Sequence, residues 1–171
     1  VYTTGLARMY GQTNDPAFSH IEGYEDHSLD MLFTWETDGR LAGVALDIPC
    51  PSQVEESIEQ FSADYWHDIR VELRRRLGDH LHVLALCGAA GDQSPHFLLY
   101  GRQEQEMNRR RGLSERQEIA VRVADAVERA LSCTQPDGAD VKLERRTRRF
   151  GRRRSGYGSD VRLAGLAPLS F

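Results

Sequence analysis

Residues 62–87, SADYWHDIRVELRRRLGDHLHVLALC, contain the pattern that decides the fold. Apolar side chains recur at spacings of three and four, as on one face of a helix: Trp66, Ile69, Leu73 and Leu77. This spacing predicts a helix over 62–77, with Ser62 as the N-cap and Gly78 as the C-terminal stop. The apolar run 82–87 predicts a buried strand, central in its sheet. A helix followed by a buried strand is half of an α/β unit.

A β-hairpin is expected upstream of this unit. Residues 28–36 alternate between apolar and polar side chains, which is typical of a half-buried strand. The dipeptide Asp38-Gly39 predicts a turn, and residues 41–48 form the returning strand. The hairpin therefore covers 28–49 and ends at Pro49 and Pro51, which cannot continue a ladder.

A second helix is expected over 114–133. Ser114 and Gln117 form a capping box at its start. Its apolar stripe consists of Ile119, Val123, Val127 and Leu131. The predicted fold class is α/β: a mixed sheet with a β-hairpin and helices packed on it, as part of a larger catalytic domain. Residues 1–27 are expected to be loop with one short strand, and residues 141–150 to be a polar edge strand.

Composition and charge narrow the function classes. The chain has 171 residues, 40% of them hydrophobic, which is enough for a sizeable core. It has no run of 18 apolar residues and no apolar signal region near its start, so neither a transmembrane helix nor a signal peptide is expected. Three scattered cysteines match neither a disulfide framework nor a zinc ribbon.

The charge is unevenly distributed along the chain. Residues 1–70 carry 3 basic and 13 acidic residues, a net charge of −10, and the remainder carries 19 basic and 13 acidic residues, a net charge of +6. Much of this excess lies in the arginine run 145–154. Such a run could contact phosphates or an anionic membrane surface. The alternatives are a solvated tail or a strand whose arginines pair with acidic neighbours. No nucleic-acid partner is expected, because no aromatic platform accompanies the run.

The best candidate for chemistry is the loop 88–96, GAAGDQSPH, which follows the apolar strand. Ligands of open α/β sheets gather outside the carboxyl ends of the strands. Gly91 would let the backbone approach a ligand, and Pro95 biases Ser94 towards an extended conformation. Ser94 could attack a carbonyl if a base or a metal activates it, and Asp92 could orient it. The alternative is a turn without a function.

Cys50, at the end of the hairpin, is the second candidate. Its thiolate could bind zinc or act as a nucleophile, and the alternative is a buried, inert thiol. His96 is the histidine that adjoins the serine loop, where it could be a second ligand.

These segments, taken together and in order, resemble the neutral/alkaline non-lysosomal ceramidases. Residues 88–96 resemble the family's G-D-x-S-P-N segment, and residues 62–65 resemble its Ser-x-Asp segment at the start of a helix. The strand running into Cys50-Pro51-Ser52 resembles the family's strand that ends in His-Pro-Thr. The resemblance covers roughly residues 28–132, and the order of strand, loop, helix, strand and Gly-Asp-x-Ser-Pro agrees.

The resemblance implies a zinc amidase that hydrolyses the N-acyl bond of a small-molecule or lipid substrate. It assigns the catalytic position to Ser94, with Gly91 and Asp92 shaping its loop, and it places Cys50 where the family has a zinc-ligand histidine. His96 stands where the family has asparagine, and the family's remaining zinc ligands have no counterpart in this sequence. The resemblance also implies an exported or periplasmic location and contact with a membrane surface.

The sequence leaves two readings of the domain open and three readings of the function. Residues 1–171 are either a single domain or part of a ceramidase-like catalytic domain, with its core at 28–132 and an arginine-rich tail at 144–171. The protein is either a zinc-assisted amidohydrolase or a non-catalytic relative that keeps the fold and binds a ligand or partner. A third reading is an anion-binding module that acts through the arginine run. If Cys50 and Ser94 share one centre, their side chains should lie within about 10 Å of each other.

Overall fold

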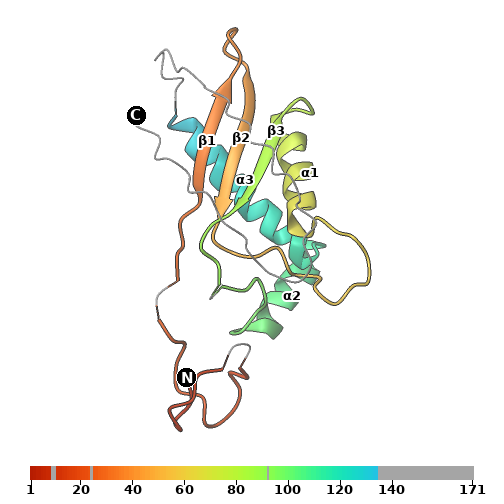
Figure 1. Ribbon diagram of the computed structural model, residues 1–171. Helices are drawn as coiled ribbons and strands as arrows, with labels where there is room; N and C mark the ends of the chain where they lie inside the picture. Colours follow the sequence, from red (N-terminus) through yellow and green to blue (C-terminus); the bar gives the residue numbers. More distant parts are fainter. Residues whose placement is uncertain (9–10, 24, 92, 135–171) are drawn as a thin grey trace, which may run out of the picture. The chain divides into compact units, whose positions relative to one another are not determined.

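A computed structural model describes residues 1–8, 11–23, 25–91 and 93–134 (Figure 1). The elements of these residues, in chain order, are β1 (Asp30–Trp35), β2 (Leu41–Ile48), α1 (Tyr65–Leu77), β3 (His82–Cys87), α2 (Gly101–Arg111) and α3 (Glu115–Ser132). The chain divides into two units, Val1–Asp137 and Gly138–Phe171, and the second lies outside the described residues. The strand expected at 141–150 and the arginine-rich tail therefore fall outside the description.

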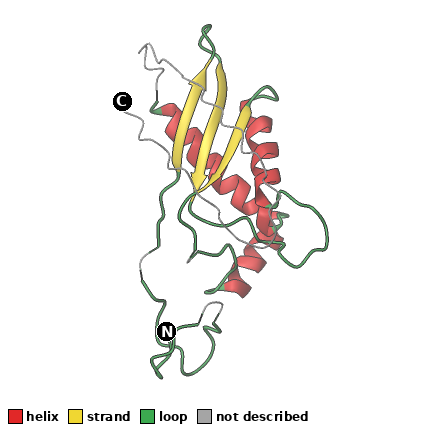
Figure 2. Ribbon diagram, viewed as in Figure 1, coloured by secondary structure: helices red, strands yellow, loops and turns green. Residues whose placement is uncertain are grey.

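The sheet is mixed, with the strand order β1-β2-β3. β1 and β2 form the expected antiparallel hairpin, whereas β2 and β3 are parallel and are joined through α1. Figure 2 shows α1 and α3 lying along the sheet. The predicted α/β class, a mixed sheet carrying a hairpin with helices packed on it, is confirmed.

The position of β3 in the sheet differs from the prediction. β2 is the central strand, and β3 lies at an edge. Along β3, side chains alternate between the packed face and an open face, where Leu84 is 59% exposed and Leu86 is 45% exposed. An apolar run suits a strand covered on both faces. In the described residues the core helices pack against one face only, so half of the run remains exposed.

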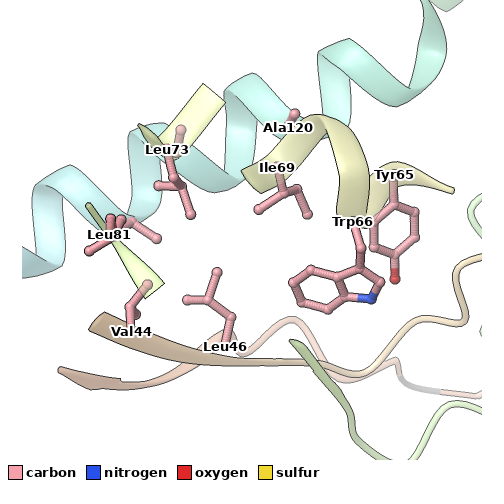
Figure 3. Close-up of a cluster of buried hydrophobic side chains, with 10 residues drawn as sticks. Val44, Leu46, Tyr65, Trp66, Ile69, Leu73, Leu81 and Ala120 are labelled. Carbon is pink, nitrogen blue, oxygen red and sulfur yellow. The ribbon is translucent and has the colours of Figure 1, made fainter. Parts of the chain in front are cut away.

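The hydrophobic core lies between the packed face of the sheet and the two helices α1 and α3 (Figure 3). β2 contributes Val44 and Leu46, and α1 contributes the predicted stripe that includes Ile69 and Leu73. On α3 the most buried positions are Ala120, Ala124 and Val127, slightly rotated from the predicted stripe. Small alanine side chains let a helix approach its neighbours closely, so the apolar face is centred on them rather than on the larger Ile119 and Val123.

The N-cap residue of α1 is not the predicted one. Asp64, not Ser62, is the N-cap residue, and its side chain accepts a hydrogen bond from the backbone N–H of Tyr65. The Ser62 hydroxyl instead accepts from the backbone N–H of Asp64, at 2.9 Å. The C-terminal end is as predicted: the N–H of Gly78, at φ 108°, donates to the carbonyl of Arg74.

The sequence interpretation missed helix α2. Its eleven residues, GRQEQEMNRRR, offer almost no apolar stripe, and Asn108 is its buried residue. Ion pairs along its surface, from Arg109 and Arg110 to Glu106, support a helix of this kind. The available signal was three arginines followed by Gly112, which adopts the left-handed conformation typical of a helix C-terminus.

The N-terminal segment contains no strand within its described residues, only an isolated bridge between Tyr2 and Phe18. The prediction of a short strand in this segment is therefore wrong. Among the helices of the described part of the chain, none has the length and apolar character needed to cross a membrane.

Candidate functional site

The candidate site lies where β2 and β3 end. Because these strands are parallel, with Ile48 opposite Cys87, the loops that follow them leave the same edge of the sheet. A cleft of about 1240 Å³ opens beside these loops. The described residues that line it come from the N-terminal segment, from the loops after β2 and β3, and from α3 through Arg122. They include Pro51, Gln53, Gly91, Gln93, Ser94 and His96.

Ser94 is half-buried in this cleft. Its Oγ accepts a hydrogen bond from the backbone N–H of His96, at 3.2 Å, which closes a short turn around Pro95. A donated hydrogen bond favours the charged form of an oxygen acid. The turn therefore orients the hydroxyl and stabilises negative charge that develops on Oγ.

The imidazole of His96 lies beside two carboxylates. Its Nε2 is 3.3 Å from Oε1 of Glu56, which belongs to the loop after β2. Burial raises the pKa of Glu115, the first residue of α3, while the charge of His96 acts in the opposite direction. The imidazole thus has an acidic neighbour that can orient it.

Asp64 anchors the loop that supplies Glu56. Its carboxylate accepts hydrogen bonds from three backbone N–H groups, those of Val54 at 3.1 Å, Glu55 at 2.8 Å and Tyr65 at 2.8 Å. The side chain is buried, and the backbone lies at φ 50°, a region that residues other than glycine rarely adopt. The surrounding hydrogen bonds hold this strained conformation, and they fix the loop next to the cleft.

Arg116 fixes the same loop from α3. Its guanidinium pairs with Glu55 at 3.0 Å and with Asp68 of α1 at 3.2 Å. One side chain thus joins the loop after β2, α1 and α3. The loop that carries Glu56, and whose Pro51 and Gln53 line the cleft, is therefore supported by two independent sets of polar contacts.

Cys50 lies next to the cleft but is not among the described residues that line it. Its half-buried Sγ donates to the carbonyl of Pro51, at 3.8 Å. Burial, and then the neighbouring Cys87, raise the pKa of the Cys50 thiol to about 11. At neutral pH this sulfur therefore carries its proton, whereas a zinc ligand must be a thiolate.

The described residues do not fit a catalytic zinc ion. A catalytic zinc needs about three protein ligands at one point, and no group of three or more His, Cys, Asp and Glu side chains in the described residues is arranged to hold a metal. His96 pairs with Glu56, at 3.3 Å. A zinc-assisted reaction would need donors beyond the described residues.

The predicted site residues therefore have different outcomes. Ser94, Gly91 and His96 line one cleft at the expected edge of the sheet. A Cβ built on Gly91 meets nothing within 4 Å, so the local space gives no reason for glycine there. Asp92 lies outside the described residues. The approach of Cys50 to Ser94 within about 10 Å stays a prediction.

Sequence reasoning missed Glu56 and Glu115 as neighbours of His96, and it missed Asp64 as the anchor of the loop. The available signal for Asp64 was its place in the Ser-x-Asp segment. Its partners Val54 and Glu55 lie about ten residues upstream, a distance over which local patterns do not predict contacts.

Comparisons with known proteins do not assign the chain to a family. No protein-family model matches it, and neither does a curated protein or a solved structure. The ceramidase resemblance accordingly stays a prediction that rests on the residues quoted for it.

Proposed function

We propose that the protein is a ceramidase-like amidohydrolase, which hydrolyses an N-acyl amide in the cleft beside β2 and β3, with Ser94 as the nucleophile. The observation that supports this most directly is the meeting of Ser94 and His96 with residues of the loop after β2 in one cleft. In an α/β sheet this edge is where ligands gather. The acyl substrate is a small molecule or a lipid.

The proposed chemistry uses Ser94, His96 and Glu56. The Ser94 hydroxyl attacks the amide carbonyl while the imidazole of His96 takes its proton, and the carboxylate of Glu56 stabilises the imidazolium that forms. His96 then gives the proton to the leaving amine, and the acyl group stays on Oγ. Water, deprotonated by the same imidazole, hydrolyses the ester and restores the serine.

The test is an activity assay with the fluorogenic hexanoyl anilide of an aminocoumarin. The 171-residue chain is expected to release the amine slowly but above the uncatalysed rate, because the proposed nucleophile, base and carboxylate all belong to this chain. Ser94→Ala should return the rate to the uncatalysed level, and His96→Gln should lower it by about 10²-fold or more. Ser132→Ala, in an exposed hydroxyl at the end of α3, is the matched control and should leave the rate unchanged.

Wild-type activity in Ser94→Ala would overturn the assignment of the nucleophile. Full activity in His96→Gln would overturn the assignment of the base. Circular dichroism of each variant shows whether a lost rate reflects lost chemistry or lost fold.

A second candidate is a non-catalytic relative that binds an N-acyl amide without cutting it. The protonated thiol of Cys50, at the position where the ceramidases carry a zinc-ligand histidine, favours this candidate. The two candidates differ in one measurement. Saturable binding of the anilide with no release of amine supports the binding domain, and release that depends on Ser94 supports the hydrolase.

A further inference from the structure

Two of the three cysteines meet at the carboxyl edge of the sheet. Cys87 is the last residue of β3, and Cys50 follows β2 by two residues. The Sγ of Cys87 donates to the carbonyl oxygen of Cys50, at 3.7 Å. A carbonyl oxygen lies about 2.4 Å from the Cα of its own residue, so the Cys87 sulfur is within about 6 Å of the Cys50 Cα.

Hydrogen bonds hold the backbone around Cys50 close to the end of β3. The hydroxyl of Tyr65, whose side chain is in the core, donates to the same carbonyl of Cys50. The N–H of Cys50 returns to the carbonyl of Ile48, at 2.8 Å, which turns the chain back towards β3. Gly88, directly after Cys87, also donates to that carbonyl. Both cysteines are therefore attached to one hydrogen-bonded junction, and rotation of their side chains is the motion that remains.

We propose that Cys50 and Cys87 are a reversible oxidation site, at which a low-molecular-weight disulfide such as glutathione disulfide converts the two thiols into an intramolecular disulfide bond. The proposal is independent of the amide hydrolysis. Cys87 is exposed and Cys50 is half-buried, so the oxidant reaches Cys87 first.

The reaction proceeds by two exchanges. The Cys87 thiolate attacks glutathione disulfide, breaks its S–S bond, forms a mixed disulfide and releases one glutathione. The Cys50 thiol then loses its proton to a solvent base, attacks the Cys87 sulfur of the mixed disulfide and releases the second glutathione as a thiolate, which takes up a proton. Because burial keeps Cys50 protonated at neutral pH, this second exchange is the slower of the two. Two protein thiols lose two electrons, one glutathione disulfide is reduced to two glutathione thiols, and the two protein protons end on these thiols.

The bond would connect the two loops that line the cleft. Cys50 immediately precedes Pro51, and Cys87 precedes the loop that carries Ser94. A disulfide forms without backbone distortion when the Cα atoms lie about 4.4–6.8 Å apart. The bound of about 6 Å places the Cys87 sulfur near the Cys50 backbone, and the bond forms if rotation of the two side chains brings the sulfurs together.

The test is thiol counting on the full 171-residue chain. The reduced chain is equilibrated with glutathione disulfide, quenched with acid, alkylated and weighed by intact mass spectrometry. The expected wild-type product has one alkylated cysteine, Cys133, and a disulfide-linked peptide pair containing Cys50 and Cys87. Cys133→Ser, the matched control in an exposed thiol, should form the same link and retain no alkylated cysteine.

Cys50→Ser should stop at the mixed disulfide, with one glutathione attached to Cys87, and dithiothreitol should reverse every product. A wild-type chain that stops at a glutathione adduct on Cys87 while Cys50 remains open to alkylation would overturn the proposal. A link between two chains, or a link from Cys133, would overturn it as well.

Discussion

At the scale of single residues, Asp64 links the fold to the candidate site. Its carboxylate satisfies three backbone N–H groups, and two of them belong to the loop after β2. This loop also presents Glu56 to His96. The cap of α1 is therefore also the support of one wall of the cleft, which links the stability of the fold to the geometry of the site.

Asp64→Ala should lower the free energy of unfolding by about 2–4 kcal/mol, because it leaves buried N–H groups without acceptors. Urea denaturation measures this loss. Asp79→Ala, in the exposed turn between α1 and β3, is the control and should change stability by less than about 0.5 kcal/mol. A loss for Asp64→Ala as small as that of the control would show that other contacts hold the loop.

At the scale of elements, the last turn of α1 carries a charge network that predicts a pH response. The hydrogen bonds from Arg75 first, and then the one from Arg76, lower the pKa of Glu72 from 4.5 to about 2, against the opposing effect of burial. Arg76 also pairs with Asp125 and Glu128 on α3, each at 2.7 Å. The network thus joins the two helices that cover the sheet.

Because the folded state lowers the pKa of Glu72, its contribution to stability is complete above pH 4.5 and disappears as the pH falls towards 2. Glu72→Gln should cost about 1 kcal/mol at neutral pH, allowing for screening around the exposed Arg75, and should flatten the loss of stability across this window. Urea midpoints from pH 2 to pH 7 measure both effects. Glu59→Gln, in an exposed loop residue, is the comparison. Equal slopes for the two variants would contradict the network.

The two faces of the sheet should respond differently to truncation. Leu73 of α1 is fully buried against the packed face, whereas Leu84 of β3 is 59% exposed on the open face. Leu73→Ala should therefore cost about 2–5 kcal/mol, and Leu84→Ala about 0.5 kcal/mol or less. Thermal and urea unfolding measure both variants. Equal losses would mean that the open face is covered in solution.

Most elements could be predicted because their signals are local. The stripe of α1, the capping box of α3 and the alternation of β1 are all contained within a few turns or one strand. The edge position of β3 could not be predicted, because it depends on how many layers cover the sheet. Helix α2 lacks an apolar stripe, and its ion pairs resemble those of any charged loop in sequence. The loop that holds Ser94 and His96 could be identified from its position after a strand, but Glu56, the partner of His96, lies 40 residues upstream.

At the scale of the whole molecule, the acidic first part of the chain is partly neutralised by arginines from later in the sequence. Arg116 of α3 reaches Glu55 and Asp68, and these contacts tie together three segments near the cleft. Within the described residues, acidic side chains from the first part of the sequence thus form ion pairs with an arginine from a later part. The arginine run 145–154 lies outside them, and its contact with phosphates or an anionic membrane surface stays a prediction.

The central claim is that the ligand binds where the loops after β2 and β3 meet. The most direct measurement is a titration of the isotope-labelled 171-residue chain with the hexanoyl anilide, followed by NMR spectra of the backbone amides. The account predicts shifts concentrated in residues 51–56, 88–91 and 93–97, the two loops whose described residues line the cleft. No response is expected at Leu32 and Leu84 on the open face of the sheet. Shifts concentrated on that open face, or a spectrum that does not change at all, would contradict it.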